Sequence, residues 1–177
     1  MRVILLAIEG NLPSALLGLV DIFWLASQAA KQNPNATPWL IQEVLVVSVD
    51  GQPIHDGRGK TIDVDCALAD IQKCDAVLIP GLMPAQDGMP PRGETIQAAA
   101  TWLSKQYQQG ALLCGSCAGV FVLGEAGLLN QRRCTTTWWL HDELRNRFPK
   151  ADVAWGAAWM MDQRIMTVGG PLSWIGM

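Results

Sequence analysis

Residues 110–127, with the sequence GALLCGSCAGVFVLGEAG, constrain the fold more than any other stretch of the chain. The segment begins as a short apolar strand over 111–114 and continues, after Gly115-Ser116-Cys117-Ala118-Gly119, as an apolar helix that ends at Gly127. Glycines near Cys117 permit a sharp, strained turn between strand and helix. This pattern is typical of a nucleophile elbow with cysteine in the central position, above the edge of a sheet.

Cys117 therefore occupies the nucleophile position. We expect its sulfur to lie at the N-terminus of the following helix, where free amides and the helix dipole favour a thiolate. The alternative is a small-residue turn that lets strand and helix pack closely and buries an unreactive thiol. Between these two, the rest of the chain favours an elbow whose cysteine is not catalytic.

Composition narrows the class of protein. The 177 residues are 50% hydrophobic and 16% charged, which excludes a disordered chain and suits one α/β domain with a covered sheet. A net charge of −3 without a long basic run indicates that this chain itself has no nucleic-acid surface. Five cysteines without framework spacing are typical of reduced thiols, so we expect a cytoplasmic protein.

Cys114 and Cys117 form a C-x-x-C pair, which can also belong to a zinc or redox site. No second pair accompanies it, and Cys114 is expected to be buried in its strand. We therefore expect neither a metal nor a cofactor.

Strands and helices are expected to alternate along the chain. Apolar runs predict buried strands over 3–8, 44–47, 75–79 and 111–114, and helical spacing predicts helices over 12–30, 94–109, 120–126 and 138–147. A small antiparallel excursion is expected over 54–64, and a hairpin with arms over 153–159 and 165–168. Asn11 is expected to cap the first helix, which is interpreted as a core helix and not a membrane span because it contains Asp21.

This alternation implies an α/β fold with three layers, built on a doubly wound, mostly parallel, flavodoxin-like sheet. Ligands of such sheets bind beyond the carboxyl ends of the strands. Gly81-Leu82 and Cys117-Ala118 both fall there, and their backbone amides are candidates for an anion or oxyanion hole.

Further motifs accompany the elbow. They are, in chain order, Asp21-Ile22-Phe23, the run CAGVFVLGEAGLL over 117–129, RRCTTTW over 132–138, Arg147-Phe148-Pro149 and Thr167-Val168-Gly169-Gly170. Together they resemble the ThiJ/PfpI superfamily, also called class I glutamine amidotransferase-like, over nearly the whole chain. Within it, the branch that forms the N-terminal domain of AraC-family transcriptional regulators is the most similar.

Departures from the family pattern bear on catalysis. Members usually read T-T-H-W where this chain has Thr137, and enzymes of the superfamily carry an acid at the position of Ala15. Without that pair, Cys117 lacks the base and the orienting group that covalent catalysis needs. His141, four residues after Thr137, is a candidate substitute base, and Glu9 is the remaining acid near the cleft. His55, the only other histidine, is interpreted as a surface turn residue.

Tryptophans are unusually frequent. Eight occur beside one tyrosine and three phenylalanines, and five lie in the last forty residues: Trp138, Trp139, Trp155, Trp159 and Trp174. We interpret them as core and dimer packing. The alternative is that one or two line a pocket for an apolar or cationic molecule, because tryptophan is the best cation–π partner.

The resemblance implies the effector-sensing and dimerising domain of an AraC-family regulator, with a degenerate pocket that binds a small metabolite. The expected ligand-binding residues are Glu9, Gly81, Leu82, Cys117, Ala118, Thr137, Trp138 and His141. Residues 1–177 are expected to be one such domain, truncated before a C-terminal helix-turn-helix domain that contacts DNA. We expect a homodimer that makes no membrane contact. A cysteine amidase or isonitrile hydratase-like enzyme and a stand-alone ThiJ/PfpI stress protein are the alternatives.

Overall fold

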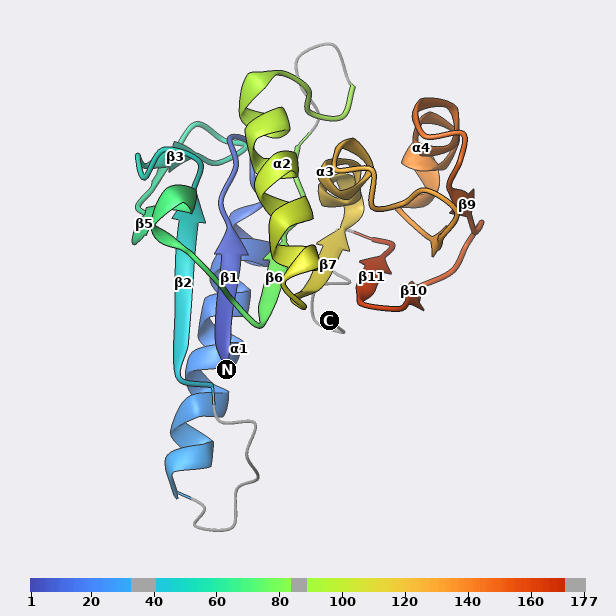
Figure 1. Ribbon diagram of the computed structural model, residues 1–177. Coiled ribbons are helices and arrows are strands. Elements are labelled where there is room, and N and C mark those ends of the chain that lie inside the picture. Colours follow the sequence, from blue (N-terminus) through green and yellow to red (C-terminus); the bar gives the residue numbers. More distant parts are fainter. Residues whose placement is uncertain (33–40, 84–88, 171–177) are drawn as a thin grey trace.

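A seven-stranded sheet forms the centre of the computed structural model, which describes residues 1–32, 41–83 and 89–170 (Figure 1). The strand order is β10-β11-β7-β6-β1-β2-β5. The strands are β1 (Arg2–Leu6), β2 (Glu43–Ser48), β5 (Cys66–Ala67), β6 (Ala76–Ile79), β7 (Leu112–Ser116), β10 (Trp159–Asp162) and β11 (Ile165–Val168). All neighbouring pairs are parallel except β10 and β11. The expected mostly parallel, doubly wound sheet is confirmed.

Two apolar cores lie on the two faces of this sheet. On one face, side chains of β1 such as Leu5 pack against Leu16 and Leu19 of α1 (Pro13–Gln32). The other face is covered by α2 (Glu94–Gln108) and α3 (Val120–Glu125), with α4 (His141–Arg147) beyond them (Figure 1). Successive strand residues alternate between the two cores, so each central strand is buried on both sides, as its continuous apolar run predicts.

Smaller elements complete the fold. They are β3 (Ile54–His55), β4 (Thr61–Ile62), β8 (Arg133–Cys134) and β9 (Asp152–Val153), with the 3-10 turns η1 (Leu68–Asp70), η2 (Cys117–Gly119) and η3 (Trp138–Leu140). β3 and β4 pair antiparallel, which confirms the excursion expected over 54–64.

The hairpin expected over 153–168 is correct only in its second half. Val153 belongs to β9, which pairs parallel with β8, whereas the antiparallel partner of β11 begins at Trp159. Gly156 lies between the two strands with a φ of 68°, a left-handed conformation that interrupts an extended run. One apolar stretch is thereby divided between two sheets.

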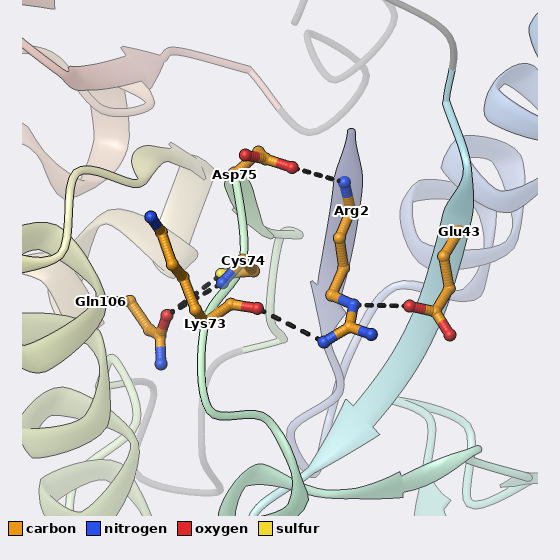
Figure 2. A network of polar contacts seen from close by, with 6 residues as sticks. All are labelled: Arg2, Glu43, Lys73, Cys74, Asp75 and Gln106. Carbon is orange, nitrogen blue, oxygen red and sulfur yellow. Dashed lines mark hydrogen bonds and ion pairs between the residues drawn. The ribbon is translucent and has the colours of Figure 1, made fainter.

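The amino ends of β1, β2 and β6 are joined by polar contacts of Arg2 (Figure 2). The Arg2 backbone N–H donates to the Asp75 carboxylate at 2.6 Å, and its guanidinium contacts Glu43 at 2.5 Å. A second guanidinium nitrogen donates to the Lys73 carbonyl at 3.4 Å, and the next residue, Cys74, donates its backbone N–H to Gln106 of α2. These contacts lie at the end of the sheet opposite to the elbow.

The interpretation of α1 as a core helix holds only for its first two turns, where Ala15, Leu16 and Leu19 are buried. Further along, Trp24 and Leu25 are exposed, because α1 extends beyond the sheet (Figure 1). By length and composition alone, α1 is the one helix among the described residues that is long and apolar enough to cross a membrane. This is weak evidence for a membrane span, because a core helix of a soluble protein can pass the same test.

Asn11 does not have the capping role expected of it. Its side-chain oxygen accepts from the backbone N–H of Ile8 at 2.6 Å, and its amide donates to the Gly81 carbonyl at 3.3 Å. The Asn11 carboxamide therefore joins the segments that follow β1 and β6, and it does not cap α1.

Four sequence expectations fall wholly or partly outside the described residues. They concern the end of the first helix at Asn33-Pro34, part of the proline-rich loop over 82–93, the last helix expected after Gly169-Gly170, and the chain end with Trp174.

The turn between β3 and β4 is organised by the buried carboxylate of Asp56. It accepts hydrogen bonds from the backbone N–H groups of Lys60 and Arg58 at 2.9 and 2.7 Å and from the Arg58 guanidinium at 2.8 Å. The Lys60 N–H, followed by the Arg58 side chain, lowers the Asp56 pKa from 3.8 to about 2.

Because the pKa of Asp56 is lower in the folded state, its contribution to stability is present above pH 3.8 and is lost as the pH falls through about 2. We predict that Asp56→Asn lowers the free energy of unfolding near pH 7, and that the difference from wild type shrinks between pH 4 and pH 2. Urea unfolding of both proteins at each pH measures the difference in the free energy of unfolding. The exposed Asp63→Asn is the control, and an Asp56→Asn difference independent of pH would contradict the assignment.

Candidate functional site

The elbow has the geometry that its sequence predicts. β7 ends at Ser116, and Cys117 follows with a φ of 51°, a left-handed conformation that side chains rarely adopt. A Cβ on Gly119 would lie 2.5 Å from the Ile79 carbonyl oxygen and 2.7 Å from that of Pro80. Only glycine therefore lets the turn before α3 approach the end of β6 so closely.

Threonines from a distant segment stabilise the strained turn. The buried Thr136 hydroxyl donates to the Cys117 carbonyl oxygen at 2.8 Å. The backbone N–H of Thr135 donates to the Thr167 hydroxyl of β11 at 2.9 Å, which fixes this segment to the sheet. From the sequence, the threonine run over 135–137 was predicted only to be extended. Nothing in the local sequence shows that a hydroxyl of this run reaches the elbow.

Burial outweighs the helix terminus in its effect on Cys117, which is only 4% exposed. Burial raises the pKa of its thiol, and a hydrogen bond with the Ala118 backbone N–H offsets this only in part. The expectation of a stabilised thiolate is therefore wrong, because removing the sulfur from water disfavours its charged form more than the amide favours it.

Strand order reverses between β1 and β6, since the chain proceeds from β1 to β2 on one side and returns with β6 on the other. Such a switch point is where ligands bind in open α/β sheets. Here Leu12 N–H donates to the Gly81 carbonyl at 2.9 Å, and Met83 N–H donates to the Gly10 carbonyl at 2.8 Å. These bonds and the Asn11 amide hold the two strand ends together.

Gly81 faces the elbow across this switch point. A Cβ placed on Gly81 would lie 3.5 Å from the Cys117 Cβ and 3.9 Å from the Ser116 hydroxyl. The structure thus brings Gly81 and Cys117, with their neighbours Leu82 and Ala118, to one place, as the sequence predicts for the ligand site.

Two hydroxyls near the elbow are buried and have no hydrogen-bond partner among the described residues. They belong to Ser116 and Thr137, which are 0% and 1% exposed. An unsatisfied buried hydroxyl is costly, so a partner supplied from elsewhere would be favourable. Thr137 was predicted as a site residue, whereas Ser116 was missed because a serine within a strand gives no local signal.

Glu9 is directed toward β3 and is largely exposed. Its carboxylate accepts from the His55 backbone N–H at 3.1 Å and lies 3.5 Å from the His55 ring. The Ala15 side chain, at the family's acid position, is fully buried. Burial and the Ala118 N–H act on the Cys117 thiol, and no carboxylate among the described residues does so.

His141 does not face Cys117 either. One ring nitrogen lies 2.9 Å from the Asp142 carboxylate and the other 3.4 Å from the Val153 carbonyl oxygen. The ring also meets Trp155 edge to face at 4.8 Å. Both nitrogens are therefore engaged with α4 and β9, so the hypothesis of a substitute base has no geometric support in this arrangement.

The tryptophans after the elbow are surface residues, so the expectation of core packing is wrong for those that the structure describes. Trp138 is 67% exposed and meets Trp139 edge to face at 5.3 Å. Trp155 and Trp159 are exposed as well, because they belong to the outer segments around η3 and the edge strand β10.

The two cysteines of the C-x-x-C pair belong to different layers. Cys114 packs in the core on the α1 face, and Cys117 in the core on the α2 and α3 face. Cys114 lies in β7 and Cys117 in the turn that follows it, so the two thiols face different cores and do not form a redox pair. In the described part of the chain, no group of three or more His, Cys, Asp or Glu residues is arranged to hold a metal ion.

Comparison with known proteins agrees with this geometry. The sequence profile of the DJ-1/PfpI family matches residues 41–174. The chain belongs to the DJ-1/PfpI family. The fold and the elbow described above are thus those of a DJ-1/PfpI domain.

Among curated relatives, this DJ-1/PfpI chain is 31% identical over 128 residues to the HTH-type transcriptional regulator CdhR of Pseudomonas aeruginosa. That match covers 72% of the chain and 36% of CdhR. Isonitrile hydratase of Pseudomonas putida is 30% identical over 102 residues, 58% of the chain and 42% of the hydratase. The matched regions thus span less than half of the length of either relative.

Among solved structures that are similar to this chain is an AraC family transcriptional regulator from Pseudomonas putida, with a TM-score of 0.72 and 17% sequence identity. The alignment covers 99% of this chain and 84% of that one. At this identity the likeness shows the shared fold.

The hydrogen bond from Thr136 to the elbow carbonyl can be tested by substitution. We predict that Thr136→Val lowers the free energy of unfolding by about 1–3 kcal/mol, because it leaves a buried carbonyl without this donor. Thr136→Ser keeps the hydroxyl and is the matched control, with a smaller loss. Urea denaturation of wild type and both variants measures the free energy of unfolding. Equal decreases in the two variants would show that this hydrogen bond does not contribute to stability.

Cys117 should be a slow nucleophile. Burial and a raised thiol pKa predict alkylation by iodoacetamide near pH 7.5 at least about tenfold slower than that of free cysteine. The rate is measured by mass spectrometry of the peptide that contains Cys117. The half-buried Cys66 is the internal control and should react first. Rapid, selective labelling of Cys117 would refute this prediction.

Proposed function

We propose that this chain is the N-terminal effector-sensing and dimerising domain of an AraC-type transcriptional regulator. The relatives support a regulator at the coarser level, since CdhR is a transcriptional regulator and an AraC family regulator shares the fold. In this proposal the chain acts in the cytoplasm, forms a homodimer, and contacts DNA through a separate helix-turn-helix domain. Its own net charge of −3 is consistent with that division of roles.

The observation that carries the proposal is an elbow kept without groups for proton transfer. Cys117 retains the strained conformation of a nucleophile position, yet its thiol is buried and its pKa is raised. Glu9 and His141, the acid and base that the sequence offered, are engaged with His55 and with Val153 and Asp142. Such a site is suited to binding a molecule and not to transforming it.

The proposed effector occupies the switch point between the ends of β1, β6 and β7. It is a small molecule with at least one hydrogen-bonding group, because the hydroxyls of Ser116 and Thr137 are buried and lack partners in the described part of the chain. Gly81 lies close to the elbow, since a Cβ on it would be 3.5 Å from the Cys117 Cβ. Leu82 and Ala118 supply the adjoining backbone amides.

The test uses the complete gene product. We predict that its reading frame encodes a helix-turn-helix region after this domain, and that a panel of small carboxylates and quaternary amines contains a compound that raises its melting temperature. Thr137→Val should weaken binding of that compound at least about tenfold in apparent affinity, because it removes a hydroxyl contact. The melting-temperature shift at a given concentration should fall accordingly. His141→Gln is the control, since its ring faces away from the site.

A gene product without a DNA-binding region would refute the regulator proposal. The observation that favours a second function is the similarity to isonitrile hydratase. Turnover of an isonitrile that is lost in Cys117→Ala would establish that alternative and exclude a purely sensory site.

A further inference from the structure

The Arg147-Phe148-Pro149 motif of the sequence has no part in the site described above. Arg147 is the last residue of α4, and its side chain is only 14% exposed. Its guanidinium forms an ion pair with the carboxylate of Glu125, the last residue of α3, which is 16% exposed. Burying an ion pair costs free energy and does not by itself stabilise a fold, so its use depends on the elements that it joins.

Arg147 contacts both α3 and the connection from β6 to α2. Its Nη2 donates to the Pro91 carbonyl oxygen at 3.4 Å. Its Cζ lies 5.6 Å from the ring centroid of Phe121 and 5.6 Å from that of Phe148, where a cation is attracted to the face of an aromatic ring. One planar guanidinium thus bridges α4, α3 and the segment that precedes α2.

Phe148, the second residue of the motif, packs against α3. A Cβ on Gly124 would lie 2.3 Å from Phe148 Cε2, so a larger residue at position 124 would displace the ring. The Phe148 ring also meets Phe121, which is fully buried, at a centroid distance of 6.0 Å. Both residues of the motif therefore hold α3 against α4.

Two further polar contacts extend this link to α2 and its approach. Gln97 of α2 donates to the second oxygen of the Glu125 carboxylate at 2.6 Å. Arg92, just before α2, pairs with Glu143 of α4 at 3.0 Å. We call this set of contacts the Arg147 brace; its members are Arg147, Phe148, Glu125, Gln97, Arg92 and Glu143.

The braced segments carry the proposed effector site at their other ends. The turn at Cys117 leads directly into α3, and Thr137 immediately precedes η3 and α4. The connection that contains Pro91 begins beside Gly81, at the end of β6. Because helices are rigid along their length, contacts at the outer ends of these segments set their spacing around the site.

We propose that Arg147 is a positioning residue of the effector site, which keeps α3, α4 and the connection after β6 at the spacing that encloses Cys117. This deepens the proposed function, since the site that it serves is the proposed effector site. Lysine cannot reproduce this role, because only the planar guanidinium pairs with a carboxylate, donates to a carbonyl and lies against two rings at once.

The experiment measures alkylation of Cys117 by iodoacetamide in the folded protein, with Cys74 as the internal control. Cys74 is 3% exposed and precedes β6, at the opposite end of the sheet, so global unfolding exposes both thiols whereas movement of α3 exposes only Cys117. We expect Arg147→Met to raise the ratio of Cys117 to Cys74 labelling at least about tenfold over wild type, because local opening becomes easier. Mass spectrometry of the two peptides gives the ratio.

Three variants separate this role from a general loss of packing. Arg145→Met removes an exposed arginine of the same helix and should leave the ratio unchanged. Arg147→Lys keeps a positive charge opposite Glu125 but loses the ring contacts, and should raise the ratio less than Arg147→Met. Adding Glu125→Gln to Arg147→Met should raise the ratio no further, because both changes remove the same contact.

An unchanged ratio in Arg147→Met, equal acceleration of both thiols, or the same increase in Arg145→Met would each overturn the assignment. The ratio is measured without an effector, so this inference and the regulator proposal fail by different results. A gene product that lacks a DNA-binding region would refute the regulator and leave the Arg147 brace standing.

Discussion

The close approach of the turn before α3 to the end of β6 determines the geometry around Cys117. Because Gly119 has no Cβ, the carbonyl groups of Ile79 and Pro80 can lie against it, and Cys117 is carried into a left-handed conformation above the strand ends. A larger residue at position 119 would force the helix away from the sheet. The Thr136 hydroxyl then holds the Cys117 carbonyl in place.

The strain at Cys117 is retained without a proton-transfer pair beside the thiol, and the proposed sensory role rests on this combination. A strained backbone persists where the surroundings over-determine it, and here Gly119 and the Thr136 hydroxyl do so. What they hold is a buried thiol directly after Ser116, whose buried hydroxyl lacks a partner among the described residues. These groups can recognise a polar molecule, but they provide neither a base nor an acid next to the sulfur.

The two faces of the sheet are covered unequally. Helices α2, α3 and α4 share one face, whereas α1 packs on the other with only part of its length (Figure 1). The remainder of α1 leaves Trp24 and Leu25 exposed.

The sequence by itself determined the features that depend on neighbouring residues. Apolar runs specify the buried strands, and the glycines near Cys117 specify the elbow, since both are properties of local backbone and periodicity. Only the tertiary structure decided the charge state that Cys117 favours, the direction of His141 and the exposure of Trp138. Each of these depends on which distant element packs alongside: burial within the α2 and α3 core, the Val153 carbonyl, and an outer turn with no layer above it.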